Sequence, residues 1–453
     1  MNDRTFPSNF LWGAATSSYQ IEGAVDTRGP SIWDTFCRVP GAVEDGSDGA
    51  VACDHLARMD EDVALMKRLG LAAYRFSISW PRVMPQGRGA CAPEGIDVYS
   101  RLVDQLLEAG IEPWVTLYHW DLPQALEDAG GWPVRDTASA FVDYATAMAE
   151  ALGDRVQHWI THNEPWCAAM LGYQFGRHAP GRTDLAASIG ASHHLLLSHG
   201  WATRRLREAL PSSARIGITL NLAPVDAASS SAADREQRRH EDGAFNRWFL
   251  EPLYGQGYPE DIVRDYIDRG GLPDDGMASW VHPGDLEAIA VPTDFLGINY
   301  YYRKVERADV PDNDPPTVVQ TPPEEWTDMG WEVFPEGLWA LLQRVHQSYA
   351  PGPMYITENG ASYDTGPQPG GAVPDVRRIQ YFRDHFAQAL RAIQDGVPLH
   401  GYFAWSLLDN FEWDRGYTQR FGMVWVDYTT QKRLPKDSAH YYAEVIARNA
   451  VVE

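Results

Sequence analysis

Short apolar runs recur along the chain of 453 residues, and longer segments with apolar positions three and four residues apart separate most of them. Each run has the length of a buried β-strand, whereas segments such as 60–69, 98–109 and 137–152 have the periodicity of helices that bury one face. The eight predicted strands are residues 10–15, 73–78, 113–117, 158–161, 216–220, 295–298, 354–357 and 401–404. Alternating strands and helices of this kind predict an α/β fold, a parallel (β/α)8 TIM barrel with long βα loops.

The same pattern predicts a single catalytic domain over residues 1–453. Barrels of this class run past about 400 residues when their loops are long, so the length does not require a second domain. No segment has the composition of an interdomain linker. Three stretches of biased composition, 226–233, 310–323 and 365–374, are short enough to be surface loops.

Charge and composition exclude several classes of partner. The chain has 38 basic and 62 acidic residues, a net charge of −24, which argues against binding to the phosphate backbone of a nucleic acid. It contains no apolar run of about 18 residues and no basic N-terminal stretch followed by an apolar one, so we expect neither a membrane span nor a secretion signal. The four cysteines form no C-x-x-C pair, which fits reduced thiols and a cytoplasmic location.

The residues at or just after the predicted strand ends are unusually polar and aromatic. Because a TIM barrel carries its active site at the carboxyl ends of its strands, these side chains are predicted to share one site. Burying so many polar groups without partners costs a few kcal/mol each, which a purely structural barrel has no reason to do. The residues concerned are Gln20, Arg75, His119, Trp120, Asn163, Glu164, Asn221, Asn299, Tyr301, Glu358 and Trp405.

Two carboxylates stand out among them, Glu164 in an N-E-P segment and Glu358 in a T-E-N-G segment. Strands four and seven end roughly across the barrel mouth from one another, so the pair could flank one bound sugar, as glycoside hydrolysis requires. Each also has a structural interpretation. Glu164 could sit at a helix N-terminus before Pro165, and Glu358 could belong to a tight turn. Their joint position at two strand ends favours the catalytic interpretation.

Longer motifs around these residues resemble glycoside hydrolase family 1, over nearly the whole chain. They are FLWGAATSSYQIEG at 10–23, YRFSISWPR at 74–82, YHWDLP at 118–123, NEP at 163–165, FLGINYY at 295–301, TENG at 357–360 and WSLLDNFEW at 405–413. The resemblance implies a retaining β-glycosidase with Glu358 as nucleophile and Glu164 as acid/base, in which the two carboxyl groups lie about 5 Å apart. It implies no metal and no organic cofactor.

The resemblance also assigns the supporting residues. Those expected to support the nucleophile are Arg75, Tyr301 and Asn299. Those expected to bind the substrate are Gln20, His119, Asn163, Tyr301, Trp405, Glu412 and Trp413, with Asn163 at the sugar 2-hydroxyl and Trp405 beneath the ring. Trp331 and Trp166 are expected to form walls of the outer, aglycone site.

Three positions distinguish this chain from other members of the family. Relatives that hydrolyse 6-phosphoglycosides usually carry a small hydroxyl residue in place of Glu412, so the carboxylate here predicts an unphosphorylated sugar. The plant thioglucosidase branch carries glutamine where this chain has Glu164. His162 departs from the family, where an aromatic residue such as phenylalanine is commoner, and we expect little effect on the mechanism.

The sequence therefore predicts a cytoplasmic β-glucosidase that removes terminal non-reducing β-linked glucose from a small glycoside or oligosaccharide, an activity typical of cellulose and polysaccharide degradation. We expect no nucleic-acid or membrane partner, and the oligomeric state stays open. Three alternatives are a β-galactosidase or β-fucosidase, a transglycosidase on the same scaffold, and a non-catalytic sugar-binding protein. The presence of both Glu164 and Glu358 disfavours the last.

Overall fold

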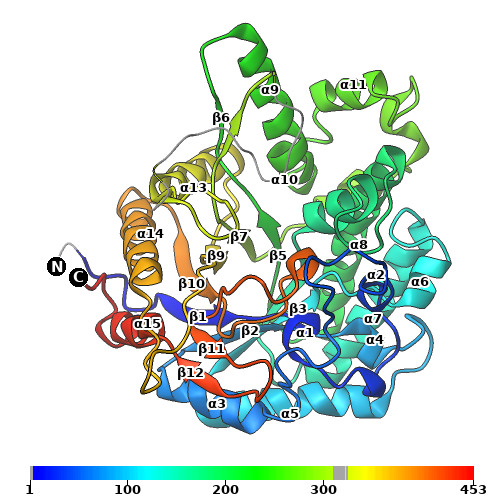
Figure 1. Cartoon of the computed structure of the whole chain (residues 1–453). Helices are drawn as coiled ribbons and strands as arrows, with labels where there is room; N and C mark the ends of the chain where they lie inside the picture. The colour runs from blue at the N-terminus through cyan, green and yellow to red at the C-terminus, as the bar shows by residue number, and fades with distance from the viewer. Residues whose placement is uncertain (1–3, 310–321, 323–324) are drawn as a thin grey trace.

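The computed structural model describes residues 4–309, 322 and 325–453, and within them eight parallel strands close into a barrel surrounded by helices (Figure 1). Around the barrel the strands follow the order β1-β10-β9-β7-β5-β4-β3-β2. They are β1 Leu11–Ala15, β2 Ala73–Ser77, β3 Glu112–Tyr118, β4 His158–Asn163, β5 Arg215–Asn221, β7 Phe295–Asn299, β9 Met354–Asn359 and β10 Leu399–Trp405. The predicted (β/α)8 fold is confirmed, and every predicted strand overlaps one of these eight.

Eight helices connect consecutive strands or follow the last one and form the outer layer of the barrel. They are α3 Met59–Arg68, α5 Pro93–Ala109, α7 Arg135–Leu152, α8 Leu185–Ala209, α12 Asp285–Ile289, α13 Pro335–Tyr349, α14 Val376–Gln394 and α15 Asp437–Arg448. These helices pack on the barrel through an apolar face. In α5 this face carries Tyr99, Leu102 and Leu106 at helical spacing, and all three are buried. Pro93 begins this helix, and Gly110 ends it with a φ of +77°. In the described part of the chain, no helix combines the length and apolar character that a lipid bilayer requires.

The βα loops carry further short elements. The α-helices are α1 Ser18–Ile21, α2 Ile32–Phe36, α4 Trp80–Val83, α6 Gln124–Asp128, α9 Ala232–Asp242, α10 Trp248–Leu253 and α11 Glu260–Asp268. The loops also contain the 3₁₀-helices η1 Val25–Thr27, η4 Gly276–Ser279 and η6 Trp413–Arg415. They contain the π-helices η2 Cys167–Gln174 and η3 Gly243–Arg247 as well. Two small ribbons pair β6 Val225–Ala227 with β8 Lys304–Glu306, and β11 Val424–Val426 with β12 Arg433–Pro435.

The three predicted surface loops have different outcomes. Residues 365–374 contain neither helix nor strand, as predicted. The prediction for 226–233 is wrong at both ends, because β6 begins the stretch and α9 starts at Ala232. The pairing partner of β6 is β8, which lies far along the chain, so local composition gives no sign of it. Apart from Pro322, the stretch 310–323 lies outside the described residues.

Aromatic side chains fill the barrel interior beneath the site. The ring of Trp114 lies 5.3 Å from that of Phe295, 5.0 Å from Phe403 and 4.8 Å from Tyr355. Gly13 makes room for them, since a Cβ there would lie 2.5 Å from the ring of Phe403. This packing fills the barrel interior with buried aromatic rings.

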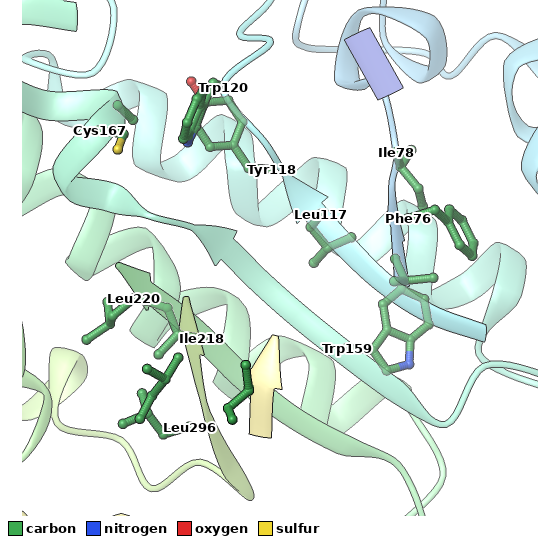
Figure 2. Close-up of a cluster of buried hydrophobic side chains, with 14 of the residues drawn as sticks. Phe76, Ile78, Leu117, Tyr118, Trp120, Trp159, Cys167, Ile218, Leu220 and Leu296 are labelled. Atoms are coloured by element: carbon green, nitrogen blue, oxygen red, sulfur yellow. The ribbon is translucent and has the colours of Figure 1, made fainter. Parts of the chain in front are cut away.

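Strand residues that alternate with the interior ones face the helices. Ile218 and Leu220 of β5 and Leu296 of β7 are buried in the layer between barrel and helices (Figure 2). Because side chains along a strand point to opposite faces in turn, Thr219 and Asn299 on the same strands face the inside of the barrel. The alternation thus delivers polar residues to the interior at the strand ends.

Candidate active site

One cavity opens among the ends of the barrel strands and brings together most of the predicted site residues. Those that line it are His119, Glu164, Trp166, Asn299, Tyr301, Trp331, Glu358, Trp405, Glu412 and Trp413. The other three, Gln20, Arg75 and Asn163, lie behind this wall and contact its members through hydrogen bonds. All of these residues except Trp166 and Trp331 belong to the seven motifs, and the fold gathers them at one place.

Two strong donors hold the carboxylate of Glu358, which belongs to β9. Nη1 of Arg75 donates to Oε1 over 2.7 Å, and the hydroxyl of Tyr301 donates to Oε2 over 2.6 Å. Only 4% of the Glu358 side chain is exposed, so these bonds are shielded from solvent. Both carboxylate oxygens are therefore fixed in direction.

Glu164 follows directly after β4 and has weaker partners. Its φ of +48° lies in the left-handed region, which costs a non-glycine residue roughly 1–2 kcal/mol. Its backbone N–H donates to the carbonyl of Thr219 over 2.9 Å, which holds this turn in place. In the side chain, Nδ2 of Asn299 donates to Oε1 over 2.6 Å, and the thiol of Cys167 donates to Oε2 over 3.1 Å. Among the described residues, no cationic side chain is hydrogen-bonded to Glu164, in contrast to Glu358.

Two asparagines connect the two carboxyl groups. Oδ1 of Asn163 accepts from Nη2 of Arg75 over 2.6 Å and from Nδ2 of Asn299 over 3.0 Å. Asn299 was predicted to support the nucleophile. It lies opposite Glu358 in the β7–β9 register and its side chain helps to lower the pKa of Glu358, while its amide also donates to Glu164. A continuous path of hydrogen bonds thus links Glu358 to Glu164 through Arg75, Asn163 and Asn299.

Glu164 and Glu358 have different hydrogen-bond partners, and their pKa values differ for this reason. Burial, and then the charge of Glu358, raise the pKa of Glu164 to about 8. Burial also raises the pKa of Glu358, but Arg75 and the Tyr301 hydroxyl oppose this rise. The first proton to leave the pair therefore comes from Glu358, which carries the negative charge while Glu164 keeps its proton.

Gln20 and Glu412 form a polar pair at the inner end of the cavity. Gln20 is fully buried in α1, and its Nε2 donates to the carbonyl of Phe411 over 2.8 Å, to Oδ1 of Asn410 over 3.0 Å and to Oε2 of Glu412 over 3.5 Å. Burial and the nearby charge of Asp414 raise the pKa of Glu412 well above its usual range. The carboxyl of Glu412 faces the cavity with its amide partner fixed behind it.

His119 lies between two indole rings and presents an unpartnered ring nitrogen. Its ring stacks on Trp405 at 5.8 Å and on Trp413 at 5.9 Å. Nε2 accepts from Nδ2 of Asn163 over 3.1 Å, whereas Nδ1 has no partner among the described residues. Burial, helped by Arg75, lowers the pKa of His119 far below its usual range, so the ring is neutral and carries its proton on Nδ1.

Trp331 and Trp166, predicted as walls of an outer site, line the same cavity. Trp331 packs on Tyr301 and Tyr302, with ring centroids 5.3 and 5.1 Å away. Trp166 packs edge-on against Phe245 at 4.8 Å and lies under the ammonium of Lys304 at 5.4 Å. Both rings are thus held by their surroundings before any ligand binds.

His162 points away from the cavity. Its ring stacks on Phe141 of α7 at 4.4 Å, and Nε2 is hydrogen-bonded to Oγ of Ser198 in α8 over 2.8 Å. It therefore occupies the layer between barrel and helices, where an aromatic ring of similar shape also fits. This position accounts for our expectation that the departure at 162 has little effect on the mechanism.

Sequence reasoning missed two contributors. Cys167 contacts the Glu164 carboxyl, and the spacing of three residues along a helical turn could have indicated this contact. Asp414 anchors the loop that carries Glu412 and Trp413. Its carboxylate accepts from Nη2 of Arg177 over 3.3 Å, a contact between distant segments that leaves no local signal. The cavity lining includes Cys167, Asp414 and Arg177.

In the described part of the chain, no group of three His, Cys, Asp or Glu side chains is arranged to hold a metal ion. All four cysteines are free thiols.

Known proteins similar to this chain match it over its full length. Residues 2–451 match the sequence model of glycosyl hydrolase family 1. The chain is 45% identical over 459 residues to β-glucosidase A of Thermotoga maritima, covering 100% of each. It is 41% identical over 464 residues to a bifunctional β-D-glucosidase/β-D-fucosidase of Bifidobacterium breve, covering 98% of each.

Solved structures give the same result. The β-glucosidase from Thermotoga maritima in complex with noeuromycin superposes with a TM-score of 0.93 at 45% identity, covering 99% of this chain and 100% of that one. The AHE enzyme from Alicyclobacillus herbarius also has a TM-score of 0.93, at 50% identity and 98% coverage of each chain.

The barrel, its paired acids and these matches define a glycoside hydrolase. The chain belongs to glycosyl hydrolase family 1, a family of retaining glycosidases, and the resemblance stated from its motifs is confirmed.

Proposed function

We propose that the protein is a retaining β-glucosidase that releases terminal β-D-glucose by double displacement, with Glu358 as nucleophile and Glu164 as acid/base. One observation carries the proposal: two buried carboxyl groups share a cavity, and within the described part of the chain only Glu358 is hydrogen-bonded to a cation. Arg75 and Tyr301 favour the ionised form of Glu358, whereas Glu164 keeps its proton. This asymmetry gives one group that can attack and one that can donate a proton.

In the first step, an oxygen of Glu358 attacks the anomeric carbon of the bound sugar. The bond from that carbon to the leaving oxygen breaks, and Glu164 transfers its proton to this oxygen as it departs. The products are a glycosyl ester of Glu358, the free alcohol of the leaving group and an ionised Glu164.

In the second step, water enters where the leaving group stood. Glu164, now a carboxylate, takes a proton from the water as its oxygen attacks the anomeric carbon, and the ester bond to Glu358 breaks. The pKa of Glu164 falls between the two steps, because the ester no longer carries the negative charge that raised it. Two displacements at one carbon return the β configuration.

The polar residues around the pair support the transition states. Asn163 lies between Arg75 and His119, where we assign it to the sugar 2-hydroxyl, whose hydrogen bonds strengthen in the transition state. Trp405 is assigned to the apolar face of the sugar ring. These roles rest on position and on the likeness to the family.

Gln20, His119 and Glu412 are assigned to the remaining hydroxyls of the sugar. The assignment rests on the likeness to the family and on position, because His119 and Glu412 line the cavity and Gln20 is hydrogen-bonded to Glu412. Relatives that hydrolyse 6-phosphoglycosides usually carry a small hydroxyl residue at this position, so the carboxyl of Glu412 supports an unphosphorylated substrate. The aromatic walls Trp331 and Trp166 suit an aryl or sugar aglycone.

A second candidate activity is the hydrolysis of β-D-fucosides. The similarity to the bifunctional enzyme of Bifidobacterium breve favours it, because that relative is named for both sugars. Galactoside hydrolysis and transfer to a sugar hydroxyl stay predictions. We also propose that the whole chain acts as one catalytic domain, which the match over residues 2–451 supports.

A substrate panel tests the proposal. Hydrolysis of p-nitrophenyl β-glucoside, β-galactoside, β-fucoside and 6-phospho-β-glucoside should be fastest for the glucoside and slowest for the phosphorylated sugar. Proton NMR of the glucoside reaction should show β-glucose before α-glucose. Turnover of the phosphorylated sugar alone, or α-glucose as the first product, would refute the proposal.

A further inference from the structure

A chain of hydrogen bonds leads through a sulfur atom to the proposed acid/base. Nδ2 of Asn221, at the end of β5, donates to Sγ of Cys167 over 3.6 Å, and Sγ donates to Oε2 of Glu164 over 3.1 Å. Cys167 begins η2 in the segment that follows β4 (Figure 2). All three residues line the catalytic cavity, and Cys167 is only 7% exposed. The thiol therefore touches the carboxyl group within the site itself.

The two oxygens of Glu164 have different partners, which gives them different tasks. Oε1 accepts a 2.6 Å hydrogen bond from the amide of Asn299, a donor with no acceptor capacity at that nitrogen. The acidic proton consequently belongs on Oε2, the oxygen beside Cys167. A thiol is both a weak donor and a weak acceptor, so it can accept from a protonated Oε2 and donate to an ionised one.

We propose that Cys167 is a positioning residue for the acid/base, and that its thiol holds Oε2 of Glu164 through both protonation states of the double displacement. This inference rests on the roles proposed for Glu164 and Glu358. Before the first step the sulfur accepts a hydrogen bond from the protonated Oε2, and Glu164 then transfers that proton to the leaving oxygen. Before the second step the S–H donates to the carboxylate and keeps Oε2 in line with the attacking water.

The pH dependence of kcat/KM for p-nitrophenyl β-glucoside tests the role, using the full chain and its Cys167→Ala and Cys167→Ser variants. The thiol hydrogen bond favours the ionised carboxyl, so its loss in Cys167→Ala should move the upper limb of the profile to higher pH, by about 0.5 unit. In Cys167→Ser the hydroxyl can still donate and accept a hydrogen bond. The upper limb of the kcat/KM profile should therefore lie at the same pH as in the wild type, or at a lower one. Cys91→Ala, at a half-buried thiol outside the site, is the matched control and should change nothing.

A second readout isolates the base step. With a dinitrophenyl glucoside the first step needs little acid, so kcat reports the water attack. It should fall roughly 3- to 10-fold in Cys167→Ala and recover in Cys167→Ser. Thermal unfolding of each variant shows whether it is folded. If Cys167→Ala does not fold, the serine variant decides alone, because a limb that rises in pH there contradicts the role.

Identical pH limbs in wild type, Cys167→Ala and Cys167→Ser would overturn the proposal, as would equal upward shifts in both variants. Failure of the proposed function would look different, because the wild-type protein itself would then not hydrolyse the glucoside.

Discussion

Nη1 of Arg75 lies 2.7 Å from Oε1 of Glu358, and both side chains are buried although 283 positions of sequence separate them. The same guanidinium donates through Nη2 to Asn163 and through Nε to Thr116. A planar cation with several donors can fix a carboxylate and an amide at once, which a lysine cannot do. The contact explains how a carboxyl group this deeply buried keeps a negative charge.

Replacement of this cation should impair the ionisation of Glu358. In Arg75→Met the pKa of Glu358 rises, since Arg75 lowers it in the native protein. Because the enzyme needs Glu358 ionised, the acidic limb of the kcat/KM profile should move up by about 1–3 pH units. At the optimum, kcat/KM should fall by about 10²- to 10³-fold. Arg88→Met, at an exposed arginine, is the control, and an unmoved acidic limb in Arg75→Met would disprove the role.

The basic limb of the pH profile should report Glu164. Its pKa of about 8 keeps the carboxyl protonated up to that pH, so kcat/KM for a nitrophenyl glucoside should decline above about pH 8. In Glu164→Gln, assayed with a dinitrophenyl glucoside that needs no acid, the basic limb should disappear while the acidic limb stays. A basic limb that persists in this variant would assign it to another group.

Removal of the nucleophile should be reversible by a small anion. Glu358→Gly should abolish hydrolysis, and azide or formate should restore turnover by attacking from the vacated space. A single displacement gives a product of inverted, α configuration, which NMR distinguishes. Retained hydrolysis in the variant, or rescue with retention, would contradict the assignment of Glu358.

Much of this arrangement could be predicted from the sequence. The eight strands were found because each is a short apolar run, and the strand-end rule then placed Glu164 and Glu358 at one site. The short ribbons escaped prediction because β6 pairs with β8, and β11 with β12, through contacts that composition does not record.

The finer geometry of the site required the fold. Asn299 was expected near Glu358, and it does help to lower the pKa of that carboxyl group. Its second contact, to Glu164, was not predicted, because a strand-end side chain has several neighbours across a barrel. Asp414 and Arg177 meet only after two distant loops fold together. His162 packs on Phe141 of α7, and this contact depends on which residues of β4 point toward the helices and which point into the barrel.

The packing inside the barrel makes its own prediction. In Gly13→Ala the new methyl group would meet the ring of Phe403 at 2.5 Å and the carbonyl of Ala73 at 2.8 Å. Overpacking of this kind costs about 1–3 kcal/mol of unfolding free energy. Gly366→Ala, at an exposed glycine with no heavy atom within 4 Å, should change stability by less than about 0.5 kcal/mol. Urea denaturation of both variants measures the difference, and equal stabilities would refute this account of the barrel interior.

The central claim is that Glu358 forms a covalent bond to the sugar, and trapping that ester tests it most directly. A 2-deoxy-2-fluoro glucoside with a dinitrophenyl leaving group forms the ester readily and hydrolyses it slowly, because the fluorine destabilises both transition states. Peptide mass spectrometry of the inactivated protein should find one fluoroglucosyl group, on Glu358. Its appearance on Glu164 or Glu412, or release of dinitrophenol with no labelled protein, would contradict the account.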